Sequence, residues 1–127
     1  MILCDTNIFI NYLNNDEATI NAFDSIGREN IAIPSIAVME LYRGMLNKQE
    51  LVRMKRYVLF YETVHVNQAA SAQAIFLLEQ FRLSHNLQIP DALIGATAIT
   101  NNLPLFTYNV KDFSFMPGLT LYNPATP

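Results

Sequence analysis

The sequence has one cysteine, four glycines and few charged residues, and each scarcity excludes a class of protein. Cys4 alone can form no intramolecular disulfide and cannot supply a zinc site of several thiolates. The glycines lie far apart, at positions 27, 44, 95 and 118, so they form no glycine-rich phosphate-binding loop. Charged residues make up 15% and hydrophobic residues 51% of the chain, which argues against disorder and predicts a compact fold.

Long hydrophobic runs and a basic excess are also missing. No run approaches the roughly 20 apolar residues of a membrane-spanning helix. The N-terminal apolar stretch follows no basic segment and is interrupted by Asp5, so we expect no signal peptide and a cytoplasmic location. Because the net charge is −3, any contact with nucleic acid must be local. The one basic stretch, either a solvated helix face or a surface for phosphate or a partner, contains Lys48, Arg53, Lys55 and Arg56.

Short apolar segments alternate with segments of helical periodicity along the chain. This alternation predicts one α/β domain over residues 1–127, built around a mainly parallel sheet of four to five strands. Ser35 and Asn67 are positioned to cap the helices that follow them. We predict strands at 1–5, 30–34, 62–66, 103–109 and 119–123, a connector at 87–90, and helices at 6–15, 16–27, 35–46, 48–60, 67–85 and 91–102.

Asp5 follows the first predicted strand directly, in the stretch "MILCDTNIFI". In a parallel α/β sheet, ligands bind outside the carboxyl ends of the strands, which is where this residue should lie. Burying an unpaired carboxylate is costly, so the fold must supply something that compensates it.

Three further acids lie in unusual settings, and each has an ordinary explanation. Glu40, inside an apolar helix, could pair with Arg43 one turn on. Asp91 opens the most apolar helix and could stabilise the helix dipole, an effect of only about 0.3–1 kcal/mol. Asp112 could cap a loop, and Asp5 itself could cap the helix that follows it.

Taken together, these acids indicate a cation site. If the strands are neighbours, the carboxylates converge on one edge of the sheet, where they repel one another unless a cation offsets their charge. Oxygen ligands without histidine or cysteine suit Mg²⁺ or Mn²⁺ better than zinc.

Four segments resemble the PIN-domain ribonucleases, and most closely the VapC-type toxins of type II toxin–antitoxin modules. They are "DTN", "MELYRG", "IPDALIGATAI" and "FTYNVKDF", in the family's order and at compatible spacing over essentially the whole chain. The resemblance implies a three-layer α/β/α PIN-like fold. It also implies an endoribonuclease that hydrolyses RNA phosphodiester bonds with Mg²⁺, or with Mn²⁺ in its place.

The resemblance also implies roles for particular residues. Asp5, Glu40 and Asp91 match the family's three principal acidic positions, as metal ligands and catalytic residues. The family's fourth position falls on the neutral Asn109, and Asp112, three residues on, could supply the missing charge as a ligand and catalytic residue. Residues that could orient a carboxylate or a water beside the metal are Thr6, Asn7 and Thr107. The ordinary alternative is that Thr6 only starts a helix and Thr107 only ends a strand.

Partners and alternatives follow from the same likeness. A toxin of this family would bind a cognate antitoxin and form a homodimer or a toxin–antitoxin hetero-oligomer, with no membrane contact. Arg43 and the basic stretch could contact RNA or the antitoxin, and the helical pair at 41–60 could offer the antitoxin a groove. The alternative is an inactive PIN domain that binds RNA or a protein. A phosphatase of the haloacid-dehalogenase type needs a second aspartate where Asn7 stands, and a receiver domain needs an acidic pair beside Asp5.

Overall fold

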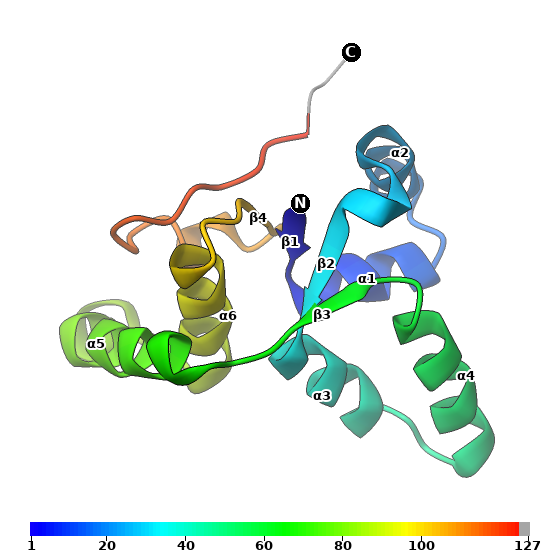
Figure 1. Cartoon of the computed structure of the whole chain (residues 1–127), viewed down its shortest axis with the longest axis horizontal. Coiled ribbons are helices and arrows are strands. Elements are labelled where there is room, and N and C mark those ends of the chain that lie inside the picture. The colour runs from blue at the N-terminus through cyan, green and yellow to red at the C-terminus, as the bar shows by residue number, and fades with distance from the viewer. Residues whose placement is uncertain (125–127) are drawn as a thin grey trace.

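The computed structural model describes residues 1–124, which form a parallel sheet with helices on both faces (Figure 1). The sheet has four strands in the order β3-β2-β1-β4, and every pair is parallel. This arrangement confirms the predicted α/β class and the parallel central sheet. The strands are β1 (Ile2–Cys4), β2 (Ile31–Pro34), β3 (Glu62–Val64) and β4 (Leu105–Phe106).

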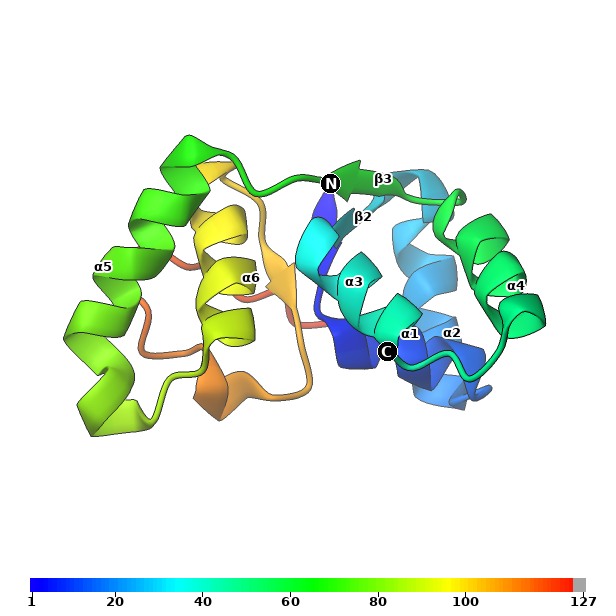
Figure 2. The ribbon, with the colours of Figure 1, turned by 90° about the horizontal axis from the view of Figure 1, so that it is seen from below.

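Helices connect the strands and cover the sheet. Figure 2 shows α5 and α6 on one side of the sheet and α1, α2 and α4 on the other. The helices are α1 (Thr6–Leu13), α2 (Glu17–Ile26), α3 (Ser35–Arg43), α4 (Lys48–Val58), α5 (Gln68–His85) and α6 (Ile89–Thr100), with short 3-10 turns η1 (Arg28–Asn30) and η2 (Val110–Asp112). No helix in residues 1–124 is both long enough and apolar enough to span a membrane.

Side chains of the strands alternate between two hydrophobic cores. Cys4 and Phe106 pack with side chains from α1 to α4, whereas Leu3 and Leu105 pack with α5 and α6. Because both faces of the sheet are covered, the strands read as continuous apolar segments rather than as an alternating pattern.

Of the two helix caps predicted from the sequence, the structure has one. Asn67 caps α5 as predicted, since its Oδ1 accepts a hydrogen bond from the Ala70 N–H at 2.9 Å. The prediction that Ser35 caps α3 was wrong: Pro34 occupies the cap position, and the Ser35 hydroxyl accepts from the Val66 N–H at 3.3 Å. Ser35 is buried where β2 and β3 end, so it serves a neighbouring segment instead of its own helix.

The connector and the fifth strand also differ from the predictions. Helix α6 begins at Ile89 and not at Asp91, because Pro90 is tolerated in a first turn that needs no N–H donor. The segment 119–123 forms one parallel bridge, between Leu105 and Leu121, and not a full strand. Only two residues of β4 are paired to β1, so this edge offers little backbone for further pairing.

Phe9 tests the packing that holds α1 against the sheet. The side chain is fully buried, with its ring centroid 5.9 Å from that of Phe23 and 5.2 Å from that of Tyr61. We expect Phe9→Ala to lower the free energy of unfolding by about 3–5 kcal/mol in urea denaturation followed by circular dichroism. Phe76→Ala, at an exposed position on α5, should cost less than about 1 kcal/mol. Equal losses for the two variants would contradict this description of the core.

Candidate functional site

The site lies where two neighbouring strands end. Asp5 follows β1 and Thr107 follows β4, and the two strands are parallel. The Asp5 N–H donates to the Phe106 carbonyl oxygen at 2.9 Å, which holds the two strand ends side by side. The predicted position of Asp5 at the carboxyl edge of the sheet is therefore confirmed.

The Asp5 carboxylate is buried and bonded at both oxygens. Oδ1 accepts from the Thr6 N–H at 2.7 Å, and Oδ2 accepts from the Thr107 hydroxyl at 2.9 Å. The first contact makes Asp5 the N-cap of α1, which was the ordinary explanation for this residue. Capping uses only one of its oxygens, so it does not exclude a second role.

Burial dominates the electrostatics of Asp5. Loss of solvent raises the pKa of this carboxyl, and the hydrogen bonds from Thr107 and Thr6 oppose the rise. The negative charges of Glu40 and Asp112 raise the pKa further. Hydroxyl and N–H donors thus hold the carboxylate in place, while the neighbouring charges are all of its own sign.

Glu40 reaches the same edge from α3. Its Oε1 accepts from the Thr6 hydroxyl at 2.8 Å, and this hydrogen bond takes the place of the predicted alternative, a pair with Arg43. Thr6 therefore binds Asp5 through its backbone and Glu40 through its side chain. One buried threonine thus links two of the predicted acids.

Asp91 lies in the first turn of α6, which is also where a residue that stabilises a helix dipole would lie. Partial burial raises its pKa from 3.8 to about 6, and the negative charges of Asp5, Asp112 and Glu40 contribute to the rise in that order. These couplings bring all four predicted acids into one electrostatic cluster. We call Asp5, Glu40, Asp91 and Asp112 the acidic edge.

Three further predicted residues, one of them Asp112 of the acidic edge, are exposed. Asp112 and Asn109 are both exposed at η2, and Asn109 donates its backbone N–H to the Thr107 hydroxyl oxygen at 3.0 Å. Asn7 is exposed in the first turn of α1, and no hydrogen bond among residues 1–124 joins its side chain to the acids.

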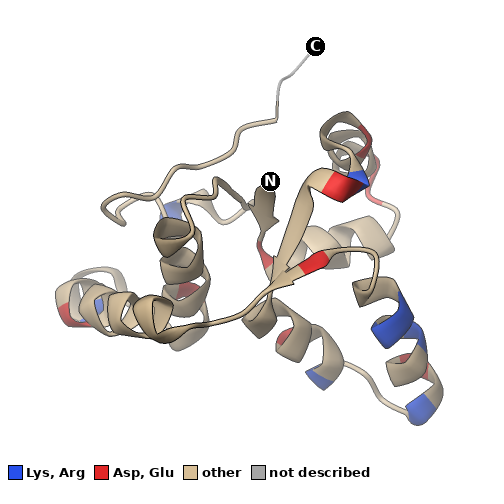
Figure 3. Cartoon of the chain, in the orientation of Figure 1, with Lys and Arg blue, Asp and Glu red and all other residues tan. Residues whose placement is uncertain are grey.

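The predicted basic residues lie on two helices. Arg43 ends α3, one turn beyond Glu40, and is exposed. The blue segments of the ribbon in Figure 3 show the other basic positions of this region along α4. The exposed basic residues of α4 are Lys48, Arg53, Lys55 and Arg56.

The donors of the acidic edge suit a hard divalent cation. Within the described part of the chain, no three histidine, cysteine, aspartate or glutamate side chains come close enough together to form a ready metal cluster. A closed cluster is not required, because Mg²⁺ usually keeps several waters and is bound through one or two carboxylates. Mutually repelling carboxylates around the buried Asp5 fit a hydrated ion of this kind.

One set of contacts near the acidic edge was not predicted from the sequence. The Tyr108 and Thr19 hydroxyls are 2.6 Å apart, and the Thr19 hydroxyl lies 2.6 Å from Asp16 Oδ2. An ionised carboxylate can only accept, so Thr19 donates to Asp16 and Tyr108 donates to Thr19. Because Thr19 and Tyr108 are 89 positions apart, no local pattern could have signalled this contact.

The chain belongs to the PIN domain family, whose model matches residues 2–117. A toxin–antitoxin complex from Klebsiella pneumoniae contains a chain with 28% identity, 98% coverage of both chains and a TM-score of 0.80. VapBC2 from Rickettsia felis, bound to a promoter DNA fragment, gives 29% identity, 97% and 98% coverage and a TM-score of 0.80. VapBC-1 from nontypeable Haemophilus influenzae shares the fold, with 22% identity, 97% and 98% coverage and a TM-score of 0.81. No curated protein sequence matches the chain.

The raised pKa of Asp91 predicts how stability depends on pH in metal-free buffer. Since the pKa is about 6 when folded and about 3.9 when unfolded, the folded state binds more protons between these values. The free energy of unfolding should therefore fall as the pH rises from about 4 to about 6. Urea denaturation in EDTA should show a smaller fall for Asp91→Asn, and greater stability than the wild type at neutral pH.

Asp24→Asn is the matched control, because Asp24 is exposed on α2. This variant should follow the wild-type curve. Wild-type and Asp91→Asn curves that stay parallel throughout the range would contradict the raised pKa of Asp91.

Proposed function

We propose that this PIN-domain chain is an endoribonuclease that hydrolyses RNA phosphodiester bonds with Mg²⁺ or Mn²⁺. The observation that carries the proposal is the acidic edge, where carboxylates surround the buried Asp5 without a compensating positive charge among the groups that shift its pKa. The same proposal takes residues 1–127 as one domain that acts in the cytoplasm.

The acids would have different roles in metal binding and catalysis. We assign Asp5 and Asp91 as direct ligands, with Asn109 or Asp112 completing the site. A bound divalent cation would lower the pKa of a water and neutralise charge on the phosphate. Glu40 is bonded at Oε1 to Thr6, which leaves Oε2 to bind the cation or to take a proton from a water.

Two threonines would keep these carboxylates oriented. Thr107 donates to Asp5 and Thr6 donates to Glu40, so neither carboxylate can rotate without losing a hydrogen bond. Outer partners of this kind hold ligands in the geometry that a metal requires. Asn7 would act on a water at the rim of the site, since it is exposed.

We further propose that the protein is the toxin of a toxin–antitoxin pair. The similarity to a chain from the Klebsiella toxin–antitoxin complex supports an antitoxin partner. Exposed apolar side chains on and beside α4, among them Leu46, Leu59 and Phe60, favour the helical pair 41–60 as its docking surface. The basic residues named above would contact RNA phosphates or the antitoxin, and the assembly would be a homodimer or a hetero-oligomer.

An inactive PIN domain that binds RNA or a protein is the second candidate. The neutral Asn109 favours it, because this residue removes one formal charge from the site. Asp112, in the same turn, is coupled to Asp5 and Asp91, and this coupling favours the active enzyme.

The purified, antitoxin-free protein should cleave labelled tRNA or a long single-stranded RNA with Mg²⁺ or Mn²⁺ and not with EDTA. Asp91→Asn should lower the rate by more than about 100-fold, because loss of an outer partner of a metal ligand already costs about 10–100-fold. Thr107→Val should fall within that smaller range, and Thr107→Ser should restore activity since it keeps the hydroxyl.

Asp24→Asn again serves as the control and should cleave like the wild type. Cleavage that persists in EDTA or in Asp91→Asn would reject the proposed site. RNA binding without any cleavage would favour the inactive domain.

A further inference from the structure

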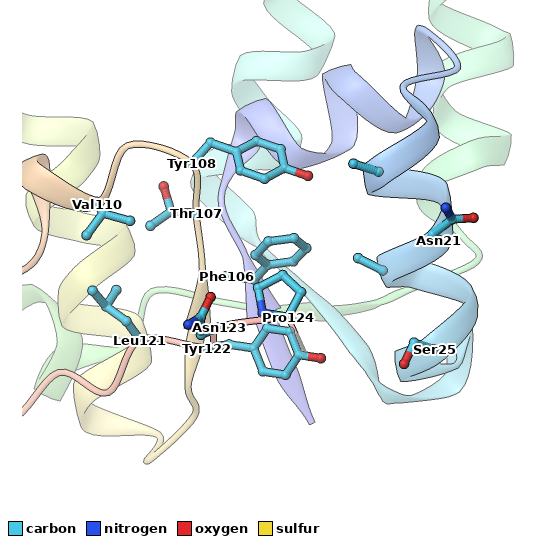
Figure 4. A pocket seen from close by; sticks show the side chains of 12 residues that line it. Asn21, Ser25, Phe106, Thr107, Tyr108, Val110, Leu121, Tyr122, Asn123 and Pro124 are labelled. Atoms are coloured by element: carbon cyan, nitrogen blue, oxygen red, sulfur yellow. The ribbon is translucent and has the colours of Figure 1, made fainter. Parts of the chain in front are cut away.

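A groove of about 980 Å³ lies between α2 and the segment that runs from β4 to the end of the described chain. We call it the α2 groove. Figure 4 shows its two walls: α2, which carries Asn21 and Ser25, and the opposite segment, which carries Phe106, Tyr108 and Tyr122. Its volume is in the range of small-molecule sites, which is about 300–1,000 Å³.

The chemistry of the groove differs from that of the acidic edge. Its described lining residues are all uncharged, and three of them are aromatic. The Phe106 ring lies edge-on between two tyrosines, with centroid distances of 5.4 Å to Tyr108 and 5.5 Å to Tyr122. On the opposite wall, the exposed Asn21 offers an amide that none of the hydrogen bonds found in residues 1–124 uses.

Thr107 connects the groove to the acidic edge. The residue lines the groove, and its hydroxyl donates to Asp5 Oδ2 at 2.9 Å. Only Thr107 therefore separates a ligand in the groove from the Asp5 carboxylate, which we assign as a metal ligand. An RNA strand whose phosphate lay at the acidic edge could place an adjoining base in this groove.

Tyr108 is held in place at this junction. Its hydroxyl donates to Thr19, which donates to Asp16, so the loop after β4 is attached to α2. Tyr108 is nevertheless 43% exposed, which leaves part of the residue available for contact with a ligand.

We propose that the α2 groove binds a nucleobase of single-stranded RNA, next to the phosphate at the acidic edge. This inference rests on the proposed nuclease function and names the part of the substrate that the groove binds. An uncharged aromatic wall suits a flat, neutral base better than a phosphate or a charged peptide. The Asn21 amide can both donate and accept, as recognition of a base edge requires.

Nuclear magnetic resonance of the full chain in EDTA tests the groove without any need for catalysis. The probes are the four nucleoside 5′-monophosphates, with inorganic phosphate as the reference. We expect at least one nucleotide to shift the Asn21 side-chain amide and the Tyr108 backbone amide saturably, whereas phosphate leaves them unchanged. Tyr108→Leu should weaken this binding about tenfold or more, the effect of one lost stacking contact.

Three further variants distinguish the contribution of the Tyr108 ring from that of the Asn21 amide. Tyr108→Phe retains the ring and should bind nearly as well as the wild type. Asn21→Ala removes an exposed amide and should weaken binding, whereas Gln80→Ala removes an exposed amide on α5 and should not. In cleavage assays, Asn21→Ala should raise KM for RNA with little change in kcat, which identifies the ligand as a base of the substrate.

Several results would overturn the inference. If the groove binds a peptide instead of a base, none of the four nucleotides should shift the signal of the Asn21 side-chain amide. The inference would also be rejected if neither Asn21→Ala nor Tyr108→Leu weakened nucleotide binding. An unchanged KM for RNA in Asn21→Ala would reject it as well. Nucleotide binding in a protein that cleaves no RNA would reject the nuclease and leave the base site standing. Cleavage without nucleotide binding would reject the base site alone.

Discussion

The burial of one carboxylate constrains the rest of the site. Asp5 directly follows the inner strand β1 and has almost no solvent contact, so the fold must compensate its charge with donors from nearby. Thr6 and Thr107 supply those donors, and they come from the start of α1 and the end of β4. Satisfying Asp5 therefore requires both elements to begin and end where they do.

The negative charge of the acidic edge is only partly compensated, and this favours a functional role for these acids over a purely structural one. A structural carboxylate is normally paired with a cation, whereas the charges that act on Asp5 and Asp91 are carboxylates. Such an arrangement destabilises the metal-free fold, and the two hydrophobic cores on either side of the sheet offset it. Acids whose pKa values are raised at a sheet edge, as those of Asp5 and Asp91 are, are typical of binding and catalytic sites.

Much of the fold could be predicted because its signals are local, and so could the positions of the principal acids. Strands buried on both faces leave apolar runs, and parallel strands bring their carboxyl ends to one edge, which located Asp5. What could not be predicted depends on tertiary contacts: Ser35 bonds Val66, and Thr19 bonds Tyr108. The segment 119–123 has the composition of a strand and yet forms only one bridge, because pairing depends on the partner strand as well.

Thr107 joins the two chemically different surfaces of this edge of the molecule. Its hydroxyl donates to Asp5 and accepts from the Asn109 N–H, and its neighbour Tyr108 is attached to α2. The turn that carries Asn109 and Asp112 is thus held from both sides, by a buried carboxylate and by a helix. A ligand that packs on Tyr108 would stabilise the same backbone that positions Thr107 against Asp5. Recognition of a base and orientation of the carboxylate that we propose as a metal ligand would then depend on one short segment, so a substrate that fits the groove would also favour the arrangement needed for the proposed catalysis.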